Sequence, residues 1–399
     1  MERTIYREIK ATPQILQLAA LLGLFILAAA ASILYVEHHG HIVTGMNNEI
    51  VWGLPHVFAI FLIVAASGAL NVASIASVFG KTPYKPMARL SGLLALSLLA
   101  GGLAVLVLDL GRPDRLIVAM TTYNFKSIFA WNILLYNGFF VIVGAYLYVQ
   151  MARSMPYSVI RVAGTVAFLW RLVLTTGTGS IFGWLVARSA YDAAVMAPLF
   201  IVMSFSFGLA VFILVLSLIT RLTDRSLGPK LIARMGRLLG IFAGLVLYFT
   251  AVQHLTNLYA AEHGSVEAFI LRDGGIYTQL FWVGQVIIGG LIPIALVFHP
   301  TGGAKPASTI VASALVIAGG FSQLYVILIG GQAFPLEIFP GFDVSSSFSD
   351  GVVNAYSPSY LELLLGLGGV ALALAITGFG MMVLRILPTN LSDANVGQS

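Results

Sequence analysis

The segment PQILQLAALLGLFILAAAASILYV, from Pro13 to Val36, decides the fold class of this chain. It has no charged residue, and an uncharged apolar run of about 20 residues is long enough to cross a bilayer as a helix. The apolar region of a secretory signal is shorter, roughly 7–15 residues. We therefore interpret this segment, which follows Arg3, Arg7 and Lys10, as a membrane anchor that is retained.

The remainder of the chain repeats this pattern. Of the 399 residues, 59% are hydrophobic and 9% are charged, whereas a soluble domain carries roughly 25% charged residues. The apolar runs are continuous, unlike the roughly ten-residue alternating segments of membrane barrels. The sequence therefore predicts an all-α integral membrane protein, a single membrane domain over residues 1–399 with about ten spans. The spans are expected near 13–36, 53–79, 87–108, 127–150, 162–184, 193–220, 236–261, 278–299, 307–330 and 359–387.

Basic residues are unequally distributed between the two sets of loops. Fifteen lysines and arginines lie in the terminal segments and after spans 2, 4, 6 and 8, whereas five lie in the opposite loops. Loops rich in Lys and Arg remain in the cytoplasm. We therefore predict a multi-pass protein of the bacterial or archaeal cytoplasmic membrane with both termini in the cytoplasm, in contact with the lipid bilayer and not with nucleic acid. The external loops carry most of the acids: Glu37, Glu49, Asp109, Asp114, Glu262, Glu267, Asp273, Glu337, Asp343 and Asp350.

A faint internal repeat suggests how the spans are grouped. The sequence SIFAW at 127–131 opens the fourth span, and TQLFW at 278–282 opens the eighth. From this we predict two four-helix bundles, spans 2–5 and spans 6–9, with spans 1 and 10 beside them. The first unit covers 53–184 and holds a ligand pocket, and the second covers 193–330. The external segment 331–358, rich in Gly, Pro, Ser and aromatic residues, is expected to pack over the external face or against a partner.

The fifth span is the least regular. Its sequence TTGTGS at 175–180 predicts a break in the helix, with residues 181–187 lying in the membrane interface. Arg171 lies about ten residues into this span, roughly 15 Å deep at 1.5 Å per residue. No carboxylate is expected at that depth, so Arg171 should meet backbone carbonyls, water or a ligand oxygen. Because ionisable groups inside spans often serve ion or proton pathways, we consider Arg171 and His254 candidates for a proton path.

Polar side chains gather at the outer ends of spans 2 to 5. His56 opens the second span and Asp109 ends the third, with Arg112 in the turn that follows. Such groups are also the usual contacts between membrane helices, which is the alternative interpretation. Their convergence at one depth favours a binding site for a quinone head group, which needs an apolar slot, a hydrogen-bonding His or Tyr, and an acid to accept a proton. We predict His56, Asp109 and Arg112 as catalytic residues. The predicted cofactor-binding residues are Asn71, Tyr123, Asn124, Trp131 and Asn132.

Four of these stretches resemble the NrfD/PsrC family of quinone-interacting membrane subunits. They are VWGLPHVF at 51–58, LDLGRPD at 108–114, NFKSIFAW at 124–131 and TGSIFGWLVAR at 178–188. Ten spans place the protein with the longer branch of the family, which includes the DsrP subunits of complexes associated with sulfite reduction. Some long-branch members carry a histidine in the second span where this sequence has Ala66-Ser67-Gly68. Either His56 takes its place or the proton-accepting site differs.

The resemblance implies a role that depends on partners. It implies electron exchange between menaquinone or ubiquinone and a ferredoxin-like iron–sulfur subunit on the external face, with other membrane and cytochrome subunits in the complex. It implies no covalent cofactor. It also suggests a link to sulfur metabolism and a contribution to proton translocation. The sequence has no cysteine, so the protein cannot itself hold a Cys-ligated iron–sulfur cluster.

Two other functions stay open from the sequence. A haem b anchor needs two histidines on facing helices, and His56 with His254 is the pair to consider. A secondary transporter would explain the faint repeat and the irregular fifth span, although transporters bind substrate near the midplane and most polar groups here lie near the outer surface.

Overall fold

The computed structural model describes residues 5–152, 154–300, 302–303, 305–336, 339, 342, 344–347 and 350–393. Four residues used in the charge analysis lie outside the described residues: Arg3, Arg153, Glu337 and Asp343. Within the described part of the protein, ten helical segments are long and apolar enough to cross a membrane. The prediction of an all-α membrane protein with ten spans is therefore confirmed.

The spans begin and end within several residues of their predicted positions. The ten spans of the described residues follow one another along the chain, and four of them are built from more than one helical element. They are α1 (Pro13–His39), α2 (Leu54–Ala69) with α3 (Asn71–Ser77), η2 (Thr82–Met87) with α4 (Ala88–Leu108), α6 (Ile128–Met151), α7 (Tyr157–Gly183), α8 (Met196–Leu222), α9 (Pro229–Tyr259), α11 (Ile276–Gln279) with the π-helical η6 (Leu280–Leu291) and α12 (Ile292–Phe298), α13 (Pro306–Tyr325) with the π-helical η7 (Val326–Gly330) and α14 (Gly331–Ala333), and α15 (Tyr360–Val383).

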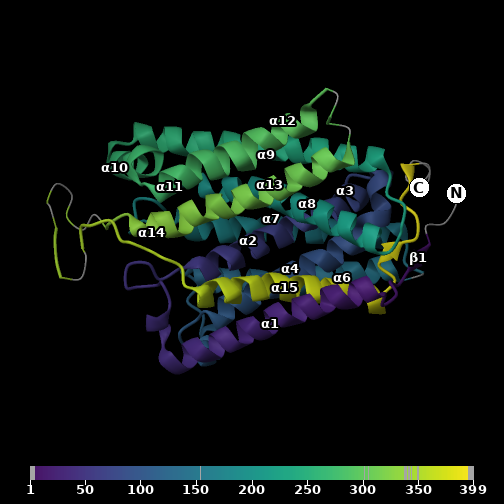
Figure 1. Cartoon of the computed structure of the whole chain (residues 1–399), viewed down its shortest axis with the longest axis horizontal. Helices are drawn as coiled ribbons and strands as arrows, with labels where there is room; N and C mark the ends of the chain where they lie inside the picture. Colours follow the sequence, from purple (N-terminus) through teal and green to yellow (C-terminus); the bar gives the residue numbers. More distant parts are fainter. Residues whose placement is uncertain are drawn as a thin grey trace.

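The helices lie side by side along the long axis of the molecule (Figure 1). Near the two ends of the described residues, β1 (Tyr6–Arg7) pairs antiparallel with β2 (Leu387–Pro388). We call the end of the bundle that carries these strands the terminal face. The opposite end, the loop face, carries short elements between the spans: η1 (His41–Val43), η3 (Pro113–Arg115), α5 (Leu116–Thr121), η4 (Ala261–His263), α10 (Gly264–Ala268) and the π-helical η5 (Phe269–Asp273).

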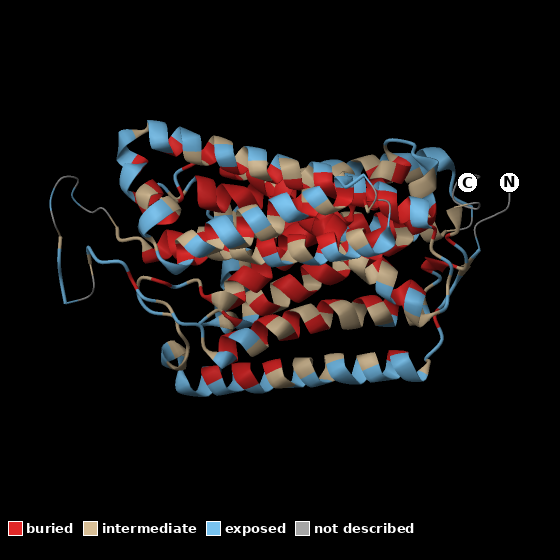
Figure 2. Cartoon of the chain, turned by 45° about the horizontal axis from the view of Figure 1, so that its top comes forward, coloured by how far each residue is buried: buried red, intermediate tan, exposed pale blue. Residues whose placement is uncertain are grey.

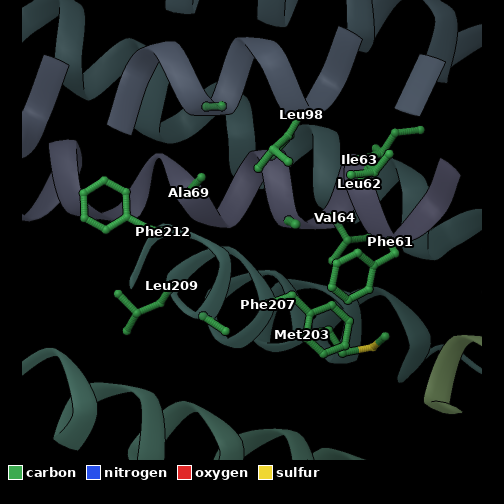
Figure 3. Packing of buried hydrophobic residues seen from close by; sticks show 14 of the residues in the cluster. Phe61, Leu62, Ile63, Val64, Ala69, Leu98, Met203, Phe207, Leu209 and Phe212 are labelled. Atoms are coloured by element: carbon green, nitrogen blue, oxygen red, sulfur yellow. The ribbon is translucent and has the colours of Figure 1, made fainter. Parts of the chain in front are cut away.

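Helix α2 forms the centre of the bundle. It packs against α4, α7, α8, α13 and α15, and nearly all of its residues are buried (Figure 2). The ring of Phe61 stacks on that of Phe207 of α8, with the centroids 5.1 Å apart (Figure 3). Because α8 packs against both α2 and α7, the two predicted four-helix units share an extensive interface, and their division into units stays a prediction.

The boundary between α2 and α3 has an identifiable cause. The Ser91 hydroxyl of α4 donates to the carbonyl of Ala69 at 2.7 Å and accepts from the backbone N–H of Ala73 at 3.0 Å. These are the two groups that would bond each other in an uninterrupted helix. A side chain inserted into the i→i−4 ladder bends a helix while leaving its polar groups paired.

The predicted break in the fifth span is wrong. Helix α7 continues through the TTGTGS sequence to Gly183, so residues 181–183 are helical and buried instead of lying in the interface. Thr175 donates to the carbonyl of Arg171 at 2.8 Å and Thr178 to that of Leu174 at 3.1 Å. In a bilayer such back-bonding satisfies the hydroxyls inside the helix, so Thr and Gly do not interrupt it.

Helices α2 and α8 come close together at Gly68 and Gly208. A Cβ atom at Gly68 of α2 would lie 1.5 Å from the backbone oxygen of Ser204, so no side chain fits there. We predict that Gly68→Ala forces α2 and α8 apart and lowers the free energy of unfolding by about 1–3 kcal/mol, the usual cost of overpacking. Unfolding midpoints measured in detergent check this. Gly144→Ala in α6 is the matched control, because a Cβ there meets nothing within 4 Å; equal midpoints for the two variants would contradict the prediction.

Candidate functional site

A cavity of about 640 Å³ lies near the loop face between α2, α4, α6 and α7. This volume is within the range of small-molecule sites, which are mostly apolar with a few polar groups. The apolar lining includes Trp52, Ile60, Leu103, Leu106, Val107, Leu116, Met120, Phe129, Ile133, Ile181, Phe182 and Leu328. The polar lining consists of His56, Arg112, Arg115, Asn132, Tyr136 and Asn137. The cavity can therefore hold a flat, largely apolar molecule that makes a few polar contacts.

His56 and Asp109 form a buried pair at the wall of this cavity. His56 lies in the first turn of α2 and Asp109 follows the last residue of α4. The His56 Nδ1 atom lies 2.7 Å from Asp109 Oδ2, and the side chains are 12% and 4% exposed. The contact has ion-pair distance, but the two atoms are not aligned as a regular hydrogen bond. Since Nδ1 faces the carboxylate, Nε2 is the ring nitrogen that remains for a ligand.

The turn that carries His56 is held by a residue from the ninth span. Gln332 accepts through Oε1 from the backbone N–H groups of Val51 and Trp52, both at 3.0 Å, and donates through Nε2 to the carbonyls of Trp52 and Leu328. Arg188 donates to the carbonyls of Gln332 and Glu49 at 2.9 Å each. The indole of Trp52 then stacks on the His56 ring at a centroid distance of 6.2 Å. The position of His56 therefore depends on contacts distant in sequence.

A second contact fixes the same turn from the segment before α15. The Tyr356 hydroxyl accepts from the backbone N–H of Leu54 at 2.6 Å and donates to Glu362 Oε1 at 2.5 Å. Burial and the neighbouring Glu362 carboxylate raise the pKa of Tyr356 well above its usual range, so its hydroxyl remains a donor. A Cβ atom at Gly53 would lie 2.4 Å from Glu362 Oε1, so this close approach requires glycine.

Asn132 and Tyr136 form the wall of the cavity on α6. The amide of Asn132 donates to the carbonyls of Ile128 and Gly177 at 2.9 and 3.0 Å, and its oxygen accepts from the Thr178 hydroxyl at 3.4 Å. The Tyr136 hydroxyl lies 3.5 Å from the same threonine oxygen. Asn132 therefore ties α6 to α7 as well as lining the cavity.

The other predicted binding residues lie outside the lining. Trp131 is 45% exposed and donates from its indole to the carbonyl of Phe125. Asn124 accepts from the backbone N–H of Lys126, and the ring of Tyr123 stacks on Phe125. Asn71 is buried at the start of α3, and its Nδ2 has no hydrogen-bond partner among the residues that the structure describes. A role for these four residues in ligand binding stays a prediction.

Arg112 lines the cavity but is not paired with Asp109. Its guanidinium forms an ion pair with Asp114 at 2.9 Å, with both side chains more than half exposed. This pair lowers the pKa of the Asp114 carboxyl, mainly through the hydrogen bond from Arg112. Arg112 therefore belongs to the cavity lining, but its guanidinium neutralises Asp114 and not Asp109.

The two residues of the predicted proton path lie in different parts of the bundle. Arg171 is buried, donates to the carbonyl of Ser67 at 3.4 Å and lies between the rings of Phe168 and Phe205, 4.8 and 5.0 Å from their centroids. The expected contact with a backbone carbonyl is confirmed, and the aromatic contacts are an addition.

His254 of α9 belongs to a second histidine–carboxylate pair. Its Nδ1 lies 2.6 Å from Oε2 of Glu267, which is 1% exposed and also accepts from Asn257. Glu267 lies in the loop between the seventh and eighth spans, as expected, but it is buried because α10 packs against α9. Asp109 is likewise buried.

Sequence reasoning missed several residues that shape the site. Trp52, Phe129 and Phe182 supply much of its aromatic lining. Gln332 and Glu362 are almost fully buried polar residues at the loop-face ends of two spans. The signal that could have found them was their position, because a polar side chain at a span end has a polar partner when it is buried.

The fold and the site define a multi-pass helical membrane protein with a ligand-sized cavity at one face. Residues 42–336 match the family model described as Polysulphide reductase, NrfD, and the chain belongs to this family. It is 32% identical over 376 residues, 92% of this protein and 93% of the relative, to an "Hdr-like menaquinol oxidoreductase integral membrane subunit" of Archaeoglobus fulgidus.

Two further relatives are more distant. Identity is 22% with a selenate reductase subunit of Mesobacillus selenatarsenatis, over 85% of this protein and 87% of that one. It is 23% with "Protein NrfD" of Escherichia coli, over 71% of this protein and 96% of that one. The archaeal relative and the selenate reductase subunit are thus both named as subunits of oxidoreductases. The family predicted from the four sequence stretches is confirmed.

Removing the Gln332 contacts tests how the site is positioned. We predict that Gln332→Met leaves the N–H groups of Val51 and Trp52 without their partner and lowers the free energy of unfolding by about 2 kcal/mol, since an unpaired buried polar group costs about 1–3 kcal/mol. Thermal unfolding in detergent measures this. The control is Gln17→Met at an exposed position of α1. A Gln332→Met protein as stable as the control would show that the hydrogen bonds of Gln332 do not contribute to stability.

Proposed function

We propose that this protein is the membrane subunit of a respiratory electron-transfer complex that exchanges electrons between the quinone pool and an external iron–sulfur subunit. The observation that carries the proposal is the His56–Asp109 pair at the wall of a 640 Å³, largely apolar cavity. A quinone ring fits such a cavity by size and polarity. The name of the archaeal relative, a menaquinol oxidoreductase subunit, supports the same substrate class. Menaquinone and ubiquinone are both compatible with the lining.

The residues of the cavity divide the work of binding and proton transfer. A bound quinol supplies two electrons and two protons as it is oxidised. The Nε2 atom of His56 accepts a proton from the ring hydroxyl while the Asp109 carboxylate stabilises the charge that develops on the imidazole. Tyr136 and Asn132 line the cavity from α6, and the rings of Trp52 and Phe182 supply apolar surface for the quinone ring. In quinone reduction the same groups work in reverse.

The electrons require a partner, because this protein has no cysteine with which to hold an iron–sulfur cluster. We place a ferredoxin-like subunit on the loop face, where Glu37, Asp114, Glu262 and Asp273 are exposed. Other membrane and cytochrome subunits complete the complex, and the family description suggests a sulfur compound as the terminal substrate. The basic residues near the terminal face support a location of that face in the cytoplasm of a bacterium or archaeon.

A haem b anchor is less well supported. The cavity that His56 lines does not include His254. The two rings face separate carboxylates, on α4 and α10. A b-type band in the dithionite-reduced spectrum of the purified complex would favour the haem anchor instead. A transporter is disfavoured because the cavity lies near one face instead of at the midplane.

Loss of the imidazole tests the proposed site. We predict that His56→Ala weakens binding of a short-chain quinone analogue by about ten-fold or more, since the hydrogen bond between the quinone and the imidazole is lost. Fluorescence-quench or calorimetric titration of the purified complex measures this. His254→Ala removes a comparable histidine–carboxylate pair away from the cavity and should retain the affinity of the native protein. Unchanged affinity in His56→Ala would remove His56 from the site.

The proton path through Arg171 and His254 has its own test. We predict that Arg171→Leu reduces proton movement in proteoliposomes while quinol-driven electron flow persists. The reason is that the substitution removes the one buried charged side chain of α7. Proton movement is followed with a pH-sensitive dye inside the vesicles. Proton movement equal to that of the native complex at the same electron flux would exclude Arg171.

A further inference from the structure

A second, much smaller cavity lies behind Asp109. Its volume is about 10 Å³, which is room for about one water molecule. Two carboxylates line it, Asp109 and Glu362, together with the polar side chains of Ser32 and Thr44. The large cavity is lined by His56 and not by Asp109, whereas the small cavity is lined by Asp109 and not by His56. Asp109 therefore stands between the two, with its Oδ2 against the His56 ring.

Glu362 is an unusual carboxylate for a membrane helix. It lies in the first turn of α15, is 2% exposed, and takes part in none of the ion pairs formed by described residues. Its Oε2 atom accepts from the backbone N–H groups of Gly45 and Ser359 at 2.8 and 2.7 Å, and Oε1 accepts from Tyr356. The titratable groups that face it are Tyr356, Tyr325 and, across the small cavity, Asp109.

The hydrogen bonds around Glu362 leave capacity for a proton. An ionised carboxylate offers about four acceptor positions, and the hydrogen bonds in the structure fill three of them. Glu362 also lies close beneath the loop face. It accepts from the N–H of Gly45, and a Cβ atom on Gly45 would lie 2.1 Å from the backbone oxygen of the exposed Ser357. A proton that reaches Glu362 therefore has a short distance to travel to the external solution.

We propose that Glu362 is the second carboxylate of a proton relay that connects the quinone cavity to the loop face. The relay runs from His56 to Asp109, through one water molecule in the small cavity, to Glu362. It rests on the proposed function, since it carries the protons that quinol oxidation releases. Each oxidised quinol breaks two O–H bonds, passes two electrons to the iron–sulfur partner, and delivers two protons to His56 in turn. Glu362 is a relay residue that acts through Asp109 and does not contact the quinol.

The competing interpretation is purely structural. Ser359 and Glu362 form a capping box, in which the Ser359 hydroxyl accepts from the N–H of Glu362 while the Glu362 carboxylate accepts from the N–H of Ser359. Such a box stabilises a helix start regardless of any proton chemistry. Ser359→Ala removes half of this box but keeps the carboxylate. Glu362→Gln keeps an amide oxygen for the backbone N–H groups but cannot ionise. The two variants therefore separate the two interpretations.

The experiment uses the complete complex with its partner subunits. The substrate is a short-chain menaquinol or ubiquinol analogue, and the electron acceptor is ferricyanide, which takes one electron per ion. We expect Glu362→Gln to lower kcat by about ten-fold or more with little change in KM, to alter the pH profile of kcat, and to delay proton release measured with a pH-sensitive dye. Glu362→Asp, which restores an ionisable group, should recover much of the rate. Ser359→Ala should keep the native pH profile and proton-release kinetics.

The possible results separate the relay from the proposed function. A Glu362→Gln complex with the native kcat, pH profile and proton-release kinetics would overturn the relay while quinol oxidation by the native complex still supports the proposed function. Loss of activity in Glu362→Gln and Ser359→Ala in parallel with their unfolding temperatures would also overturn it in favour of the cap. A native complex that neither binds nor oxidises either analogue would reject the proposed function, and the relay with it.

Discussion

Hydrocarbon cannot form hydrogen bonds, and this constraint determines where the polar groups of this protein lie. In the centre of the bundle, the Ser91 hydroxyl replaces the missing helical bond between α2 and α3. The threonines of α7 bond to their own helix. Arg171, the one charged group deep in that helix, lies between two aromatic rings and one carbonyl. The backbone and hydroxyl groups of the scaffold are satisfied in this way, and His56, with Asp109 against its ring, lines the large cavity.

The candidate site is completed by parts of the protein that lie far from it in sequence. His56, Asp109 and Asn132 come from the first half of the sequence, whereas Gln332 and Tyr356, which hold the turn before α2, come from the last third. The small residues Gly45 and Gly53 allow this approach. The spans around the cavity therefore do not by themselves determine the position of His56. Helix α14 and the segment before α15 determine it as well.

Much of this arrangement could be predicted from the sequence. Length and hydropathy located the ten spans, and depth alone placed His56, Asp109 and Asn132 near one another. The same reasoning did not reveal that Trp131 lies outside the cavity lining or that Glu267 is buried, because a span's boundaries say little about which way a residue at its end faces, or whether a loop turns inward. It also failed for the TTGTGS sequence, where propensities measured in water overstate the cost of Thr and Gly inside a membrane helix. Gln332 was missed because the N–H groups that it accepts from, those of Val51 and Trp52, lie about 280 residues away. Glu362 has one partner 317 residues away, Gly45, but its capping box with Ser359 is a local signal that could have found it.

The packing of α1 against α15 has a consequence for biosynthesis. The ribosome delivers the first span to the membrane long before the last one, so the face of α1 that α15 will cover first meets lipid or an insertion factor. The antiparallel pairing of β1 with β2 can form only after residues 387–388 have left the ribosome. Closure of the bundle is therefore a late event. A protein truncated before the tenth span would leave the α15-facing surface of α1 exposed to lipid or to the insertion factor.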